Sequence, residues 1–93
     1  MAVINNGSLS ADGSSADQQW RGGTGFVTAS GTFGGGTLEL ELSLNGGSTY
    51  VGAGTGGQLT SAGSFVFELP DDALIRVTLS GSTGPSLEYT ISA

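Results

Sequence analysis

The chain has 93 residues, of which 37% are hydrophobic and only 11% are charged, and 18 of them are glycines. Eight acids against two arginines give a formal net charge of −6, and lysine, histidine and cysteine are all absent. This composition excludes a disulfide framework and thiolate or histidine metal sites, and the negative charge argues against nucleic-acid and anionic-membrane partners.

The beginning of the chain is predicted to be an arm of a single domain that spans residues 1–93. MAVINNGSLS lacks the positive and apolar regions of a secretory signal, so we expect a protein that is not exported. Val3–Leu9 is a short candidate strand, and SADGSSAD at residues 10–17 is the stretch expected to be most mobile. Residues 1–19 together are expected to form an extended or mobile N-terminal arm.

The next segment, QQWRGG, contains the only tryptophan of the chain, within a short candidate strand at Gln18–Arg21. Such a tryptophan can stack on a sugar, anchor a partner subunit or cap the end of a sandwich core, and the sequence leaves these alternatives open. The candidate partner-contact residues are Trp20, Arg21, Gln18 and Gln19, at the end of a long loop that starts at Ser10. This hypothesis predicts that Trp20→Ala weakens assembly and leaves the β fold intact.

Alternation of apolar and polar residues predicts the following strands. GFVTASGTF at 25–33 places Val27, Ala29 and Phe33 on one face. TLELELSL at 37–44 places four leucines, Leu38, Leu40, Leu42 and Leu44, on one face and Thr37, Glu39, Glu41 and Ser43 on the other. A helix would scatter these leucines around its circumference, and glycines bound the segment on both sides, so a strand is favoured.

SLNGGSTY at 43–50 is predicted to be a hairpin. Asn-Gly after an alternating strand is a strong hairpin signal, because both residues tolerate positive φ. The stretch also resembles the Asp-box pattern S-x-D-x-G-x-T-W at Ser43, Asn45, Gly47, Thr49 and Tyr50, with Asn for Asp and Tyr for Trp. In families that carry it, this box is a folded hairpin away from the catalytic site, so the resemblance implies a structural role. A short candidate strand, Thr49–Gly52, follows.

Three more runs alternate with a period of two: SFVFEL at 64–69, ALIRVTLS at 73–80 and SLEYTIS at 86–92. Their predicted inward residues are Phe65, Phe67, Leu69, Ile75, Val77, Leu79, Leu87, Tyr89 and Ile91. PDD at 70–72 and GSTGP at 81–85 are predicted to be the turns between them. Seven to eight short strands separated by turns predict an all-β, antiparallel β-sandwich of jelly-roll or immunoglobulin-like topology.

The acidic residues offer only weak candidates for chemistry. Glu39 and Glu41 share one strand face, and paired carboxylates can act as acid and base in glycoside hydrolysis. A flat, solvated face provides no cleft for that reaction. Asp71 and Asp72, with Glu68 close by, fit a turn better than a calcium site. Because no base is available to activate a serine or threonine, we predict no enzyme activity, no cofactor and no metal.

Four segments in order resemble small Gly/Thr-rich structural proteins of tailed bacteriophages. They are GTFGGGTLEL at 31–40, NGGSTY at 45–50, FVFELP at 65–70 and LIRVTLSGSTGPSL at 74–87, within a similarity that covers residues 20–92. This group includes capsid decoration (cement) proteins, head fibres and small tail components, commonly β-sandwich trimers. The resemblance implies a non-enzymatic virion protein and carries over no catalytic residue.

The sequence therefore favours a capsid decoration protein that is assembled in the bacterial cytoplasm and located on the virion. Its expected partners are the major capsid protein or another virion protein, and further copies of itself in a homo-oligomer, with a trimer favoured. A small carbohydrate- or receptor-binding module of a fibre or tail is the alternative. That alternative would place Trp20 and Tyr50 on an exposed sugar-binding surface.

Overall fold

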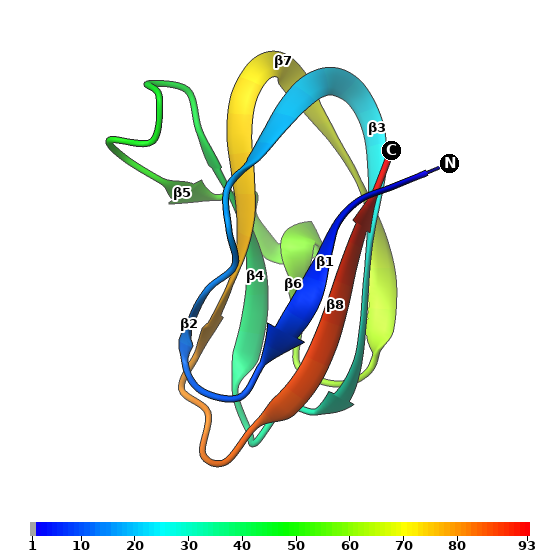
Figure 1. Cartoon of the computed structure of the whole chain (residues 1–93), viewed down its shortest axis with the longest axis vertical. Coiled ribbons are helices and arrows are strands. Elements are labelled where there is room, and N and C mark those ends of the chain that lie inside the picture. The colour runs from blue at the N-terminus through cyan, green and yellow to red at the C-terminus, as the bar shows by residue number, and fades with distance from the viewer. Residues whose placement is uncertain (1) are drawn as a thin grey trace.

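A computed structural model describes residues 2–93 and confirms an all-β, antiparallel fold (Figure 1). Its strands are β1 (Val3–Leu9), β2 (Gly13–Ser14), β3 (Gln18–Thr32), β4 (Thr37–Ser43), β5 (Val51–Gly52), β6 (Gln58–Leu59), β7 (Gly63–Ser80) and β8 (Ser86–Ser92), with one 3-10 turn, η1 (Thr55–Gly57). The order across the sheet is β1-β8-β3-β7-β4-β5, while β2 pairs with β7 and β6 with β4. The described residues include no helix long and apolar enough to cross a membrane.

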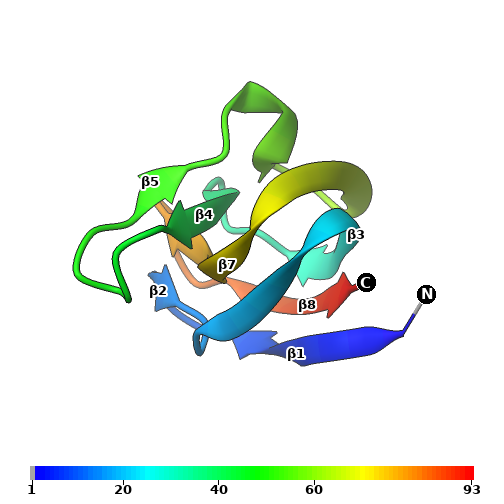
Figure 2. The ribbon, with the colours of Figure 1, turned by 90° about the horizontal axis from the view of Figure 1, so that it is seen from above.

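Two long, bent strands fold this sheet over onto itself in a sandwich-like arrangement (Figures 1 and 2). The first layer consists of β1, β8, the C-terminal part of β3 and the N-terminal part of β7. The second layer consists of β2, β4, β5, β6, the N-terminal part of β3 and the C-terminal part of β7. β3 and β7 are longer than the predicted strands because they continue around the corner from one layer to the other.

The corner is built by a β-bulge where a turn was predicted. Trp20 pairs with Ala73 and Arg21 with Asp71, so Asp72 is an extra residue without a partner in β3. Its φ of 60° is the only positive φ among the described non-glycine residues, and aspartate tolerates this region better than most residues. The prediction that PDD at 70–72 separates two strands is therefore wrong, because a bulge bends the strand without ending it.

The predicted alternation supplies most of the core between the layers. The buried hydrophobic residues are Trp20, Val27, Ala29, Phe33, Leu38, Leu40, Leu42, Phe67, Ala73, Ile75, Val77, Leu79, Leu87, Tyr89 and Ile91. The prediction is wrong for Leu44, which is 66% exposed, and for Ser43, which is 1% exposed. β4 ends at Ser43, so the period of two stops there and no longer determines which way the next side chain points.

Most of the predicted N-terminal arm belongs to the sheet. β1 pairs with β8 from Val3 opposite Ser92 to Leu9 opposite Leu87. The following segment is bonded across to β7, since Ser15 N donates to the Val77 carbonyl at 2.8 Å. The backbone of the predicted arm is therefore paired with the sheet along Val3–Leu9 and again at Ser15.

Candidate functional site

The predicted contact residues at 18–21 divide into one core side chain and three accessible ones. Trp20 is 1% exposed, its ring lies 4.8 Å from that of Phe67, and its Nε1 donates to the Leu69 carbonyl at 3.2 Å. Among the alternatives for Trp20, intramolecular capping of the core is the one that the structure shows, and a partner cannot reach the ring in this conformation. Gln18 is half-buried, whereas Gln19 and Arg21 are exposed.

These accessible neighbours of Trp20 lie beside the corner. A shallow hollow there is lined by Gln19, Trp20, Arg21, Asp71 and Asp72. Within residues 2–93, no three His, Cys, Asp or Glu side chains are grouped as metal ligands would be, so the calcium alternative gains no support. Gln18, Gln19 and Arg21 remain predicted contact residues.

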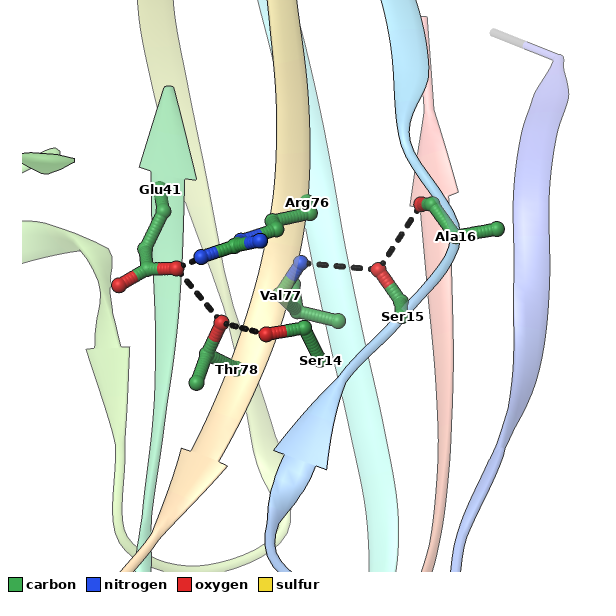
Figure 3. Close-up of polar contacts among 7 residues, drawn as sticks. All are labelled: Ser14, Ser15, Ala16, Glu41, Arg76, Val77 and Thr78. Atoms are coloured by element: carbon green, nitrogen blue, oxygen red, sulfur yellow. Dashed lines mark hydrogen bonds and ion pairs between the residues drawn. The ribbon is translucent and has the colours of Figure 1, made fainter. Parts of the chain in front are cut away.

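The solvent-facing side of the second layer carries a polar network, which we call the Glu41 cluster (Figure 3). It is formed by Glu41, Arg76, Thr78 and Ser14. Arg76 Nε lies 2.8 Å from Glu41 Oε1, and Thr78 Oγ1 donates to the same oxygen at 2.6 Å. The Ser14 and Thr78 hydroxyls are 2.8 Å apart and hydrogen-bonded. The strand register explains why these four side chains lie together. Glu41 pairs with Arg76 across β4–β7, and Ser14 pairs with Thr78 across β2–β7.

The electrostatics of this cluster suit an ionised carboxylate. Burial raises the pKa of Glu41, but the hydrogen bonds from Thr78 and Arg76 and the charge of Arg76 outweigh it, so the pKa lies below its ordinary value of 4.5. A general acid needs the opposite shift. Glu39, the other predicted carboxylate, accepts a hydrogen bond from Gln58 Nε2 at 2.8 Å. Both side chains therefore hold strands together across the sheet.

Glu41→Gln is expected to lower the free energy of unfolding by about 1–3 kcal/mol at neutral pH, because it weakens hydrogen bonds to a charged, largely buried group. A depressed pKa means that this stability is present above pH 4.5 and is lost as the pH falls through the folded-state pKa. The difference between wild type and variant should therefore shrink in acid. Urea unfolding at a series of pH values measures this difference in the free energy of unfolding. Glu88→Gln, the same substitution at an exposed position, is the control. A pH-independent difference would contradict the ionised pair.

Tyr50 packs against this cluster. The guanidinium carbon of Arg76 lies 3.7 Å from the centre of the Tyr50 ring, in a cation–π contact. Burial raises the pKa of Tyr50 above 10.0, and the nearby Asp17 carboxylate raises it further. The buried hydroxyl nonetheless has no hydrogen-bond partner of good geometry among the described residues. One face of the ring is thus covered by Arg76.

The predicted hairpin at 43–50 is present and joins β4 to β5. Leu42 of β4 pairs with Val51 of β5. Its loop is longer than a two-residue Asn-Gly turn, and the positive φ values belong to Gly46 and Gly47. We call residues 44–50 the β4–β5 loop. The sequence signal located this loop correctly, but the residue next to the asparagine, not the asparagine itself, takes the left-handed conformation.

Side chains inside the hairpin fix the β4–β5 loop. The buried Ser43 Oγ accepts a hydrogen bond from Gly47 N at 2.9 Å and donates to Asn45 Oδ1 at 2.8 Å. Asn45 Oδ1 also accepts from Thr49 N at 3.0 Å. The serine, asparagine, glycine and threonine of the Asp-box-like pattern therefore organise the loop itself, which accounts for that pattern without a ligand.

Two aliphatic side chains stand exposed at the two ends of this loop. Leu44, its first residue, is 66% exposed, and Val51, the first residue of β5, is 58% exposed. Figure 1 shows the loop projecting from the body of the molecule. Sequence reasoning missed this site for Leu44, because the alternation of β4 assigned that residue to the core.

Comparison of the chain with protein-family models, with curated proteins and with solved structures gives no match. Its function must therefore be inferred from its own side chains.

Proposed function

We propose that the chain is a non-enzymatic structural protein of a bacteriophage virion, a capsid decoration protein that binds neighbouring capsid subunits as a homo-oligomer. The observation that carries the proposal is the projecting β4–β5 loop, which presents Leu44 and Val51 to solvent. Exposed aliphatic residues on a projecting segment are suited to a contact with another protein surface. The resemblance of the sequence to small phage structural proteins supports a capsid protein as that partner.

The internal bonding of the loop supports a role in binding. Ser43 and Asn45 satisfy the amides of Gly47 and Thr49 from within the hairpin. A loop that is ordered before it meets a partner loses less conformational entropy on association, so more of the contact energy is available for affinity. Leu44 and Val51 would then enter the partner surface as fixed anchors, with the loop backbone already satisfied.

The carbohydrate-binding alternative has less support from the side chains. It requires Trp20 and Tyr50 on an exposed surface, but Trp20 is 1% exposed and Arg76 covers one face of the Tyr50 ring. Sugar binding of this kind depends on an open aromatic face on which the ring of the sugar can stack. We therefore do not propose that function.

On this proposal the coding sequence of the chain lies in a phage genome, where the proposal can be tested. Deleting the coding sequence should leave particles that lose their DNA more readily on heating, and mass spectrometry of purified wild-type particles should detect the chain. Purified protein added back should bind the deleted particles. Absence of the chain from wild-type particles, or no binding on add-back, would refute the proposal.

Leu44→Glu is expected to weaken add-back binding at least 10-fold, because a charge replaces an aliphatic anchor in a desolvated contact. The fold should persist, since Leu44 is 66% exposed. Ser48→Glu, an exposed position within the same loop, is the matched control for charge. Equal losses in both variants would point to general repulsion from the particle in place of a specific contact at Leu44.

A further inference from the structure

The outward face of the first layer carries an apolar row across four strands. Ser92 of β8 pairs with Val3 on one side and with Phe26 on the other, and Phe26 pairs with Val66. Residues that pair directly across strands point to the same side of a sheet. Val3 is 58% and Val66 60% exposed, and Phe26 between them is half-buried. Three large apolar side chains therefore stand on this side of the sheet, away from the core.

The neighbouring row on the same face is polar and uncharged. It runs from Asn6 through Thr90 and Thr28 to Ser64, again by direct cross-strand pairing. We call the two rows together the outer face. Its central strands, β8 and β3, contribute Thr90 and Thr28 to this row.

The charge distribution indicates what covers this face. Glu68, paired with Thr24, and Glu88, paired with Ser30, flank the outer face at its opposite ends. The other six of the eight acids lie elsewhere: Asp12, Asp17, Glu39, Glu41, Asp71 and Asp72. Two copies of a chain with a net charge of −6 repel each other, so self-association is least opposed where carboxylates are fewest.

We propose that the outer face is the contact between two copies of this chain, packed face to face about a two-fold axis. A two-fold axis brings the same patch of both copies together, and the apolar row then meets the apolar row of the second copy. The inference rests on the proposed function, because it assigns a surface to the homo-oligomer in that proposal, as a two-fold dimer in place of the trimer that the sequence analysis favoured. It uses a surface separate from the β4–β5 loop, which stays free to contact the capsid.

The size of the face sets the expected affinity. With four strands about 4.8 Å apart and two rows separated by two residues at about 3.3 Å each, the face measures roughly 20 Å by 13 Å. This is smaller than the roughly 800 Å² per partner of a standard stable interface. We therefore expect a dimer that dissociates on dilution and is strengthened where many copies are bound side by side on a particle.

Sedimentation equilibrium of the full chain between about 1 μM and about 1 mM tests this, because weak dimers dissociate in that range. The wild-type mass should rise from that of one chain towards that of two. Val66→Glu should raise the dissociation constant at least 10-fold, since it places like charges in the contact. Ser48→Glu, which adds the same charge at an exposed position of the β4–β5 loop, should leave it unchanged. A wild-type monomer at the highest concentration, or an oligomer that survives Val66→Glu, would overturn the inference.

Cross-linking gives a second readout that does not depend on destabilising the contact. Because the chain has no cysteine, Thr28→Cys introduces a single thiol in the middle of the outer face, and a bis-maleimide with an arm of about 10 Å, the spacing of packed sheets, should yield a covalent dimer. Ser48→Cys in the β4–β5 loop is the control and should yield little. Equal cross-linking of both variants would overturn the assignment. Failure of these tests with intact particle binding would refute the outer face alone, whereas loss of particle binding with an intact dimer would refute the proposed function alone.

Discussion

Replacing Trp20 by alanine is expected to lower the free energy of unfolding by about 3–5 kcal/mol, the range for truncating a buried aromatic side chain. Trp20 is 1% exposed and packs against Phe67 at the bend of β3 and β7. Its loss would leave a cavity there and remove the hydrogen bond from Nε1 to the Leu69 carbonyl. Because small domains are stabilised by only about 5–15 kcal/mol, the variant should be close to unfolding at physiological temperature.

Urea unfolding followed by far-ultraviolet circular dichroism measures this effect, since the variant lacks the only tryptophan. Trp20→Phe is the control: it keeps an aromatic ring against Phe67 but removes the indole donor, so its loss should be smaller than that of the alanine variant. A Trp20→Ala protein with unchanged stability but impaired self-association would reverse this interpretation and restore Trp20 as a partner contact.

The strands and most of the core follow from alternation because burial on one side of a sheet imposes a period of two on the sequence itself. Leu38, Leu40 and Leu42 show this, and so do Val27 and Ile91, all of which are buried as predicted. Val3–Leu9 also forms a strand with the predicted bounds. Such information is local, so a single sequence contains it.

The corner and the location of Trp20 could not be predicted, because they depend on strand pairing. Pro70, Asp71 and Asp72 are residues typical of turns, yet β3 pairs with β7 on both sides of Asp72 and makes it a bulge. The residues around Asp72 do not indicate that a distant strand, β3, pairs with the chain on both sides of them. Trp20 becomes a core residue only because β3 bends at this corner and brings its ring against Phe67.

The candidate surfaces were equally inaccessible to sequence reasoning. The apolar row of Val3, Phe26 and Val66 combines residues from three strands, and it exists only through the order β1-β8-β3-β7. Leu44 was assigned to the core by a period that ends one residue earlier, at Ser43. In both places the sequence contains the residue types, while the fold decides which of them meet and which face solvent.

Gly25→Ala is expected to destabilise the protein by about 1–3 kcal/mol through overpacking of the same corner. Gly25 pairs with Phe67 across β3–β7 and is buried. A methyl group there would overlap the Phe67 ring and lie 2.6 Å from Trp20 Cη2. Both rings are enclosed by the core, so neither can turn aside without disturbing other side chains. The small gain from replacing a strand glycine by alanine, about 0.5–1 kcal/mol, does not offset this overlap.

Gly63→Ala provides the matched control, because it changes an exposed glycine of the same strand pair, opposite Ala29, where the nearest atom to an added methyl group is 3.6 Å away. This variant should be neutral or slightly stabilised. Phe67→Leu should partly rescue Gly25→Ala, since a shorter side chain vacates the space that the new methyl group needs. A double-mutant cycle by urea unfolding measures the coupling. If the two changes are additive, the overlap with Phe67 is not the cause of the destabilisation, and the close packing of the two rings over Gly25 is not what requires glycine at this corner.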